Sequence, residues 1–68
     1  MRIIKIDDVS DVTGLARSTI YKYIGEGSFP DSVPLGGRSV GWVESEVQGW
    51  IRERIEERDL AKLALGKH

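Results

Sequence analysis

The apolar positions of the first 27 residues follow a helical period that is interrupted at one glycine. Val9 and Val12, three residues apart, give the segment before Gly14 one apolar side over about two turns. After Gly14, apolar residues again recur at helical spacing, and polar side chains occupy the opposite side. The apolar side of this second segment consists of Ile20, Tyr23 and Ile24. We therefore predict two short helices joined by a tight turn, the second over about residues 16–26.

The ends of these two helices carry local signals. Asp7 or Asp8 is the expected N-terminal cap of the first helix, where a carboxylate opposes the positive end of the helix dipole. Gly14 suits a left-handed residue that ends this helix. Ser18 or Thr19 is the expected cap of the second helix, and two glycines near residue 26 mark its end.

Residues 33–43 alternate between apolar and polar with a period of two, on both sides of a glycine-rich tip at residues 36–38. This pattern predicts a β-hairpin with a loop of about three to five residues. Pro34 assigns the first strand to an edge, because proline cannot donate a ladder hydrogen bond. Residues 1–6 also alternate, which is typical of a short strand or of an extended arm.

A third helix is predicted from Glu44 or Ser45 onwards, with one apolar face. That face consists of Val47, Trp50 and Ile51. Beyond Ile51 the face ends, because Arg54 and Arg58 occupy the positions that would point toward a core. The part of the helix that packs on the domain is therefore expected to end near residue 58.

The order of elements is helix, turn, helix, hairpin, helix, a mainly α fold with a small β-hairpin. This is the order of a winged helix-turn-helix. We predict one such domain over residues 1–58, since the chain is too short for a second core. Residues 59–68 form a C-terminal tail, either a frayed helix or a partner surface that uses Leu60 and Leu63.

Composition argues against several classes of protein. The chain of 68 residues has no cysteine, which excludes disulfides and thiolate metal sites, and its single histidine is the terminal His68. The carboxylates are adjacent in sequence or lie along a solvated helix, so we expect no catalytic residue, metal, cofactor or small-molecule ligand, and no enzyme. No apolar run approaches the roughly 20 residues of a membrane span, and no signal peptide is recognisable. We expect a cytoplasmic protein without a membrane partner.

The distribution of charge favours nucleic acid as a partner. A net charge of −1 is unfavourable by itself, because phosphate contacts dominate the affinity for nucleic acids. Acidic residues, however, cluster near the N-terminus and in the third helix, whereas the second helix carries Arg17 and Lys22 and the hairpin tip carries Arg38. If these segments share a face, that face is positive. We therefore predict double-stranded DNA as the partner, with association near the nucleoid and self-association on DNA or through Leu60 and Leu63.

The polar side chains of the second helix each have a structural and a functional interpretation. Arg17 stands at a helix start, where a cation opposes the helix dipole, so a phosphate or guanine contact explains it better. Lys22 lies opposite the apolar side and is expected on a phosphate. Ser18 and Thr19 are either caps or DNA contacts, and Tyr21 either contacts DNA or packs laterally.

The hairpin and the two tryptophans complete the candidate residues. Arg38 follows two glycines on an exposed ribbon, from which an arginine reaches a phosphate or the minor groove, and we prefer this role to the alternative of a turn residue chosen for solubility. Trp42 and Trp50 lie on apolar sides of their elements, so we expect both in the core and neither stacked on a base.

Five separated segments form a set that resembles the AlpA-type prophage regulators, part of a wider group of excisionase-like and MerR-like winged-helix proteins. They are Val12–Tyr21, Gly27–Pro30, Val33–Gly36, Val40–Trp42 and Glu46–Ile51. The resemblance implies a phage- or prophage-associated protein that binds DNA. It carries the DNA-contact role to the recognition-helix residues Arg17, Ser18, Thr19, Tyr21 and Lys22 and to the wing-tip residues Gly37, Arg38 and Ser39. Ala16 departs from the family pattern, in which serine is common, and the chain after Arg52 is not covered.

Three functions are compatible with these observations. We predict a sequence-specific transcriptional regulator of phage or prophage origin, with the second helix in the major groove and the hairpin, residues 33–43, on flanking DNA. The first alternative is an excisionase, which uses the same surface to bend DNA at an attachment site. The second alternative is a protein-interaction adaptor that acts through the C-terminal helix.

Overall fold

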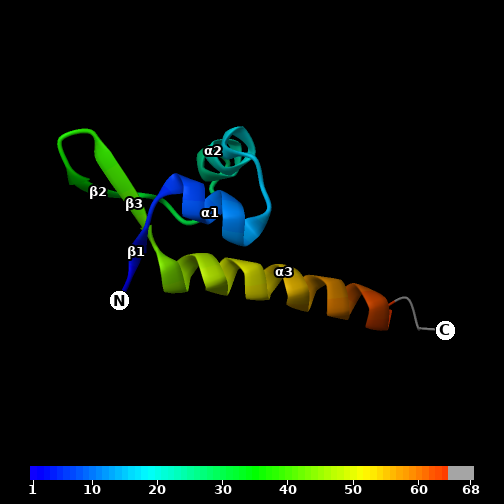
Figure 1. Cartoon of the computed structure of the whole chain (residues 1–68). Coiled ribbons are helices and arrows are strands. Elements are labelled where there is room, and N and C mark those ends of the chain that lie inside the picture. Colours follow the sequence, from blue (N-terminus) through cyan, green and yellow to red (C-terminus); the bar gives the residue numbers. More distant parts are fainter. Residues whose placement is uncertain (65–68) are drawn as a thin grey trace.

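The computed structural model describes residues 1–64 and arranges them as three helices and a three-stranded sheet (Figure 1). The elements are β1 (Ile3–Ile4), α1 (Ile6–Thr13), α2 (Arg17–Gly25), β2 (Val33–Gly36), β3 (Ser39–Val43) and α3 (Glu44–Ala64). In Figure 1, α1 lies between α2 and α3, and the β2–β3 hairpin projects to one side. His68, the single histidine of the chain, lies outside the described residues.

The sheet has the order β1-β3-β2, with both pairs antiparallel. Ile3 pairs with Val43 and Ile4 with Trp42, so of the two interpretations of the N-terminal segment the structure has the strand. Pro34 lies on an edge strand, as predicted, because β2 has a neighbour only in β3.

The hairpin loop is shorter than predicted. The turn between β2 and β3 consists of Gly37 and Arg38, so the expected loop of three to five residues was wrong. Gly36 and Gly37 have φ angles of 107° and 56°, and the register shifts between Pro34 and Gly36. Because glycine adopts positive φ without a Cβ clash, the chain bulges and reverses within these few residues.

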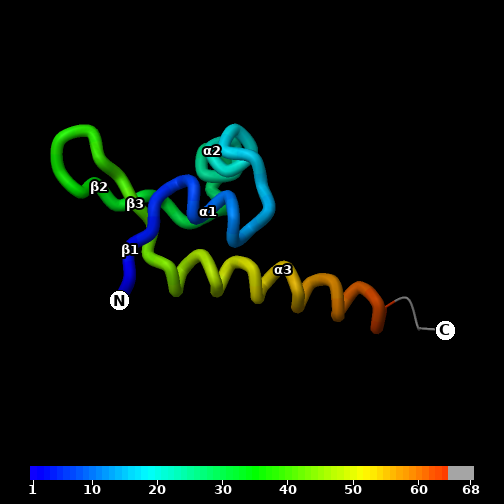
Figure 2. The backbone as a smooth tube through the Cα atoms, in the orientation of Figure 1, coloured from blue at the N-terminus to red at the C-terminus, as the bar shows by residue number. Residues whose placement is uncertain are grey.

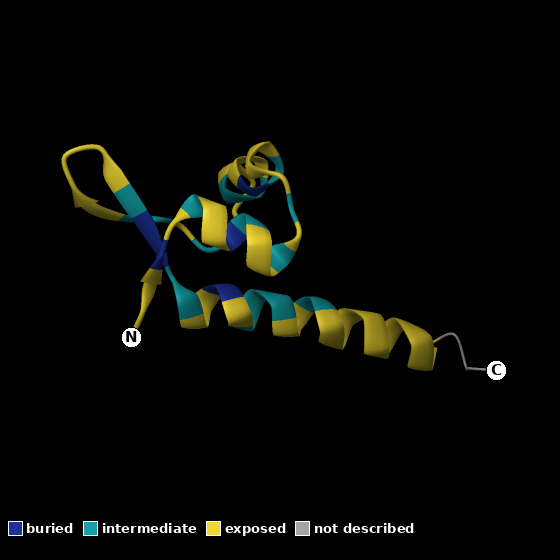
Figure 3. Ribbon diagram, in the orientation of Figure 1, coloured by how far each residue is buried: buried dark blue, intermediate teal, exposed yellow. Residues whose placement is uncertain are grey.

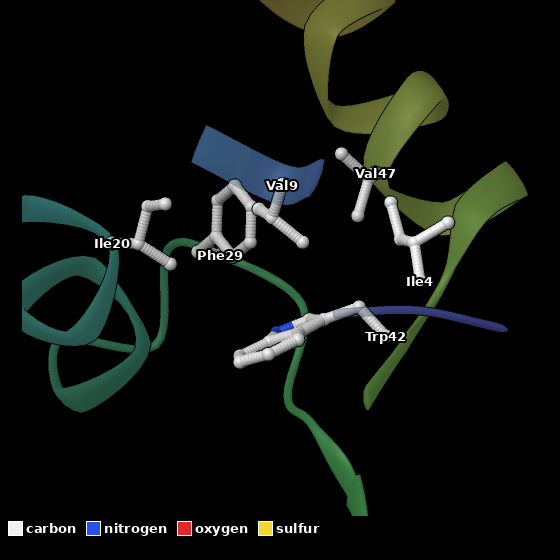
Figure 4. Close-up of a cluster of buried hydrophobic side chains, with 6 residues drawn as sticks. All are labelled: Ile4, Val9, Ile20, Phe29, Trp42 and Val47. Carbon is white, nitrogen blue, oxygen red and sulfur yellow. The ribbon is translucent and has the colours of Figure 1, made fainter. Parts of the chain in front are cut away.

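The hydrophobic core contains residues from all three helices, from β1 and β3, and from the segment between α2 and β2 (Figure 4). Its buried residues are Ile4, Val9, Ile20, Phe29, Trp42 and Val47. Trp42 is fully buried, and its indole N–H donates to the carbonyl oxygen of Pro30 over 3.1 Å, which satisfies the one polar atom of the ring. The predicted apolar stripe of α1 is only partly confirmed, since Val9 is buried whereas Val12 is 47% exposed.

Both predictions of side-chain caps were wrong. The N-cap residues are Lys5 for α1 and Ala16 for α2, and neither makes a side-chain cap hydrogen bond. Each helix begins earlier than the polar residues suggested, so Asp7 and Asp8 lie in the first turn of α1.

The glycine at the end of α1 behaves as predicted. Gly14 has a φ of 75°, and its N–H donates to the carbonyl oxygen of Ser10 over 2.8 Å. Thr13 adds a second tie in the same turn, because its hydroxyl donates to the carbonyl oxygen of Val9 and accepts from the N–H of Leu15. The turn between α1 and α2 is thus held by backbone and side-chain hydrogen bonds together.

α3 packs on the domain only through its first two turns and a half. Val47 is buried, Trp50 and Ile51 are partly buried, and the exposed remainder is yellow in Figure 3. The helix continues without a break to Ala64, and the tube in Figure 2 shows it extending beyond the other elements. Leu60 and Leu63 on this extension are 65% and 75% exposed. Residues 59–64 of the expected tail therefore continue α3.

Candidate nucleic-acid interface

α2 divides into a packed side and a polar side. Ile20 is fully buried, and Tyr23 and Ile24 pack around the core, as the helical period predicted. On the other side the candidate side chains are exposed except for Thr19, which is partly buried. The exposed ones are Arg17, Ser18, Tyr21 and Lys22. The packing of one side of a short helix thus presents four of the five sequence-predicted residues to solvent.

The N-terminal end of α2 favours anions. Its first turn contains no acidic residue, and Ala16 leaves its N–H groups without a side-chain cap. The unpaired N–H groups of a helix start carry partial positive charge. Lys22, further along the polar side, has no ion-pair partner among residues 1–64. Within Arg17–Gly25, α2 thus carries two cations and no acidic side chain, in a protein with a net charge of −1.

Arg17 differs from Lys22, because it is already paired. Its Nη2 atom donates to a carboxylate oxygen of Asp7, which lies in the first turn of α1. The two side chains remain 64% and 70% exposed, so the pair is on the surface. The sequence analysis assigned Asp7 a capping role and missed this contact. No local signal reports it, because ten residues and the α1–α2 turn separate the partners.

Of the two roles that the sequence left open to Tyr21, the structure shows the lateral packing. Its ring centroid lies 6.2 Å from that of Trp42, with the rings tilted by 59°, so one side of the ring packs over β3. The residue is nevertheless 51% exposed and remains accessible on the polar side of α2. Lateral packing and an exposed hydroxyl edge are thus compatible.

The wing tip is formed by Gly37, Arg38 and Ser39, all of them exposed. Arg38 lies in the turn itself and has no ion-pair partner within the described part of the chain. Figure 1 shows the hairpin tip and α2 both on the side of α1 that is away from α3. In this view α1 therefore separates α3, which carries many of the acidic residues, from the two elements that carry Lys22 and Arg38.

Trp42 lies in the core, as predicted, whereas Trp50 is only partly buried and packs against the core. Trp42 is fully buried under α2. Trp50 donates from its indole N–H to the carbonyl oxygen of Ser28 over 2.6 Å, contacts Phe29 edge-on at 4.9 Å between centroids, and carries the Arg54 guanidinium 4.9 Å from its ring. These contacts join α3 to the segment after α2.

Other kinds of site have no counterpart in the described residues. Residues 1–64 contain no cluster of three histidine, cysteine or acidic side chains placed to hold a metal ion. Within the same range, no helix combines the length and the apolar character that crossing a membrane requires.

Helix, tight turn, helix and β-hairpin, with a third helix behind them, define a winged helix-turn-helix protein. A model of the family described as "Prophage CP4-57 regulatory protein (AlpA)" matches residues 2–55. The chain belongs to this AlpA family of prophage regulators, as its sequence motifs had indicated.

The chain is also similar to two individual proteins, of which the second supports this assignment. An uncharacterised protein of Enterobacteria phage P4, ORF88, is 46% identical over 57 residues, which cover 84% of this chain and 65% of that protein. The chain thus spans just under two thirds of the length of ORF88. The DNA-binding transcriptional activator AlpA of Escherichia coli (strain K12) is 37% identical, and the match covers 82% of this chain and 89% of that activator.

Proposed function

We propose that this protein binds double-stranded DNA sequence-specifically and regulates transcription from a phage or prophage genome. In the proposed complex, α2 enters the major groove and the β2–β3 hairpin contacts flanking DNA. The observation that carries the proposal is the position of two of the five cations that have no ion-pair partner among residues 1–64, the others being Lys5, Arg52 and Lys62. Lys22 on α2 and Arg38 at the wing tip have no ion-pair partner among residues 1–64, and both are exposed. Phosphates are the anions that such a pair of elements meets on DNA.

The roles of the individual side chains follow from their chemistry. Lys22 is a point charge with three donors and suits a phosphate, as does Arg38 at the wing. Arg17 offers a planar fork that suits guanine or a phosphate. The hydroxyls of Ser18, Thr19 and Tyr21 supply short polar contacts near the start of the helix. Gly37 and Ser39 let the wing backbone approach the DNA closely.

A winged domain with this charge binds weakly as a single copy. The net charge of −1 opposes approach to DNA, and only a few cations lie on the proposed face. We therefore propose that residues 1–58 form the DNA-binding unit and that several copies assemble on one DNA, in the cytoplasm at the nucleoid. No catalytic residue, cofactor or small-molecule ligand is part of this proposal.

Two other functions make different predictions. An excisionase uses the same surface, but it requires repeated sites beside an attachment site and bends the DNA measurably. The similarity to a protein named as a transcriptional activator favours the regulator. An adaptor acts through α3, and the specific observation in its favour is the exposure of Leu60 and Leu63 on the projecting part of the helix.

The experiment that tests the proposal is a fluorescence-anisotropy titration at two salt concentrations. The probes are duplexes from the protein's own genomic neighbourhood and a scrambled duplex of equal length. Arg17→Ala/Lys22→Ala removes two cations from α2, and Arg52→Ala/Lys62→Ala removes two from α3 as a control with the same charge change. Each phosphate contact contributes about 0.9 to the slope of log K against log salt. The α2 variant is expected to lower this slope by about 2, and the control to leave it nearly unchanged.

The outcomes separate the three functions. Preference for a native duplex that is lost in the α2 variant and kept in the control supports the regulator or the excisionase, and a bending assay then distinguishes these two. Equal loss in both variants indicates charge-driven binding without a specific face. Absence of binding to any duplex at low salt, by a protein whose circular dichroism shows it folded, refutes the proposal and leaves the adaptor.

A further inference from the structure

The first turns of the two helices of the helix-turn-helix are joined by one ion pair. Asp7 of α1 accepts a hydrogen bond from the Nη2 atom of Arg17, the first residue of α2. Asp8, the next residue along α1, is also an exposed carboxylate, but it has no ion pair among residues 1–64. The pairing therefore reflects a particular geometry between the helices rather than a general attraction to the acidic start of α1.

The pair leaves most of the guanidinium available. Arginine has five N–H donors in a rigid planar fork, and Asp7 accepts a hydrogen bond from only one of the two terminal nitrogens. Both side chains are mostly solvent-exposed, at 64% and 70%, so the interaction is weak enough for DNA to compete with it. Asp7 thus favours one orientation of Arg17 and partly compensates its charge, while other donors of the guanidinium remain available to solvent.

Orientation and charge act on different parts of DNA binding. Non-specific binding is electrostatic and depends on the number of uncompensated cations. Specific binding depends on donors held in register with a base edge or with one phosphate. A carboxylate that partly neutralises an arginine and also orients its guanidinium therefore lowers the non-specific affinity more than the specific affinity.

We propose that Asp7 is a specificity-determining residue, which positions Arg17 and reduces its attraction to arbitrary phosphates. The proposal rests on the proposed function, since it assumes that α2 contacts DNA. It assigns a role to a residue of α1, outside the recognition helix and the wing. If so, removing the Asp7 carboxylate increases the affinity for non-specific DNA more than the affinity for the specific site.

Asp7→Asn and Asp8→Asn form a matched pair for the test. Both variants remove one negative charge from the first turn of α1, so long-range attraction to DNA and the helix-dipole effect change alike. Only Asp7→Asn removes the charge that faces Arg17. The measurement is the affinity of each variant for a native duplex and for a scrambled duplex, by anisotropy at the same two salt concentrations.

The expected result is a selective loss of discrimination. Relative to Asp8→Asn, Asp7→Asn is expected to bind the scrambled duplex about two- to fivefold more tightly, which corresponds to the strength of an exposed ion pair. The ratio of native to scrambled affinity falls by a similar factor. In an Arg17→Gln background the two variants are expected to be equal, because the partner of Asp7 is gone. Asp7→Ala, which also removes the acceptor, is expected to act in the same direction as Asp7→Asn.

Other outcomes overturn the inference. Equal affinity ratios for the Asp7 and Asp8 variants mean that only net charge matters, and an Asp7 effect that persists with Arg17→Gln means that Asp7 acts without Arg17. Both outcomes presuppose that the wild-type protein binds DNA, so they leave the proposed function intact. Failure of the wild-type protein to bind either duplex refutes the proposed function and this inference together.

Discussion

Gly41 lies where an added methyl group would meet both strands that flank β3. It lies in β3, is buried, and pairs with Val33 of β2. A Cβ atom added there would overlap the Cγ2 methyl of Ile3 and approach the carbonyl oxygen of Ile4 and the Cδ1 atom of Leu35 at 3.1 Å each. The Ile3 methyl is attached to a stiff β-branched carbon and the Ile4 oxygen belongs to the backbone, so neither moves without shifting β1.

Gly41→Ala is therefore expected to destabilise the fold. Overpacking a closely packed site costs about 1–3 kcal/mol. A chain of this length has a free energy of unfolding of about 3–10 kcal/mol, from the usual stability per residue. For a domain of this size, each kcal/mol lowers Tm by about 4–8 °C. The assay is urea denaturation followed by tryptophan fluorescence, to which Trp42 next to the substitution and Trp50 both contribute, with a thermal melt by circular dichroism.

Gly49→Ala provides the opposite control. Gly49 lies within α3, and an added Cβ would have no heavy atom within 4 Å. The same chemical change is therefore expected to stabilise the protein by about 0.5–1 kcal/mol, the usual advantage of alanine over glycine inside a helix. If Gly41→Ala is as stable as the wild type while Gly49→Ala gains stability, then β1 does not pack against β3 at this position, and the reasoning about the sheet is refuted.

Four further substitutions test separate parts of the structure. Trp42→Phe leaves the Pro30 carbonyl oxygen without its 3.1 Å donor and is expected to cost about 1–3 kcal/mol in urea denaturation. Gly14→Ala places a Cβ at a φ of 75° and is expected to cost about 1–2 kcal/mol, seen as a lower Tm. Arg38→Ala is expected to lower the salt slope of DNA binding by about 1 without changing Tm, and an unchanged slope would remove the wing from the interface. Leu60→Lys, at an exposed position, is expected to change stability by less than about 0.5 kcal/mol, while any self-association through α3 decreases in sedimentation velocity.

The spacing of hydrophobic residues predicted most of the architecture, because each helix and strand is positioned by the side chains that it buries. Ile20 and Trp42 are fully buried, and α2 and the hairpin both have about the bounds that their spacing indicated. Helix starts were predicted less well. The capping hydroxyl or carboxylate expected at each start is absent, and Lys5 and Ala16 take the N-cap positions. Whether a helix begins one residue earlier depends on tertiary packing, which outweighs the modest free energy of a single cap.

The candidate site was predictable in its residue types and not in its contacts. Exposure of Arg17 and Lys22 follows from their place opposite the apolar side of α2. Two contacts could not be predicted in this way: Arg17 pairs with Asp7, and Tyr21 packs on Trp42. Each contact joins two segments whose relative position is set only by the folded chain. Periodicity assigns a residue to a face of its own element, but the neighbours on that face come from another element.

One residue connects the two elements proposed to contact DNA. Trp42 belongs to β3, the strand that leads back from the wing tip, and pairs with Ile4 of β1. Its ring packs against Tyr21 of α2, and its indole N–H is bonded to Pro30, in the segment that follows α2. Because this ring is fully buried in a small core, a change in the angle between α2 and the hairpin requires repacking of that core. The distance between α2 and the hairpin is therefore set by packing at Trp42 rather than by a flexible linker. In the proposed complex, a rigid spacing of this kind would let two weakly binding elements engage neighbouring positions on DNA together, which would compensate for the small number of cations on each.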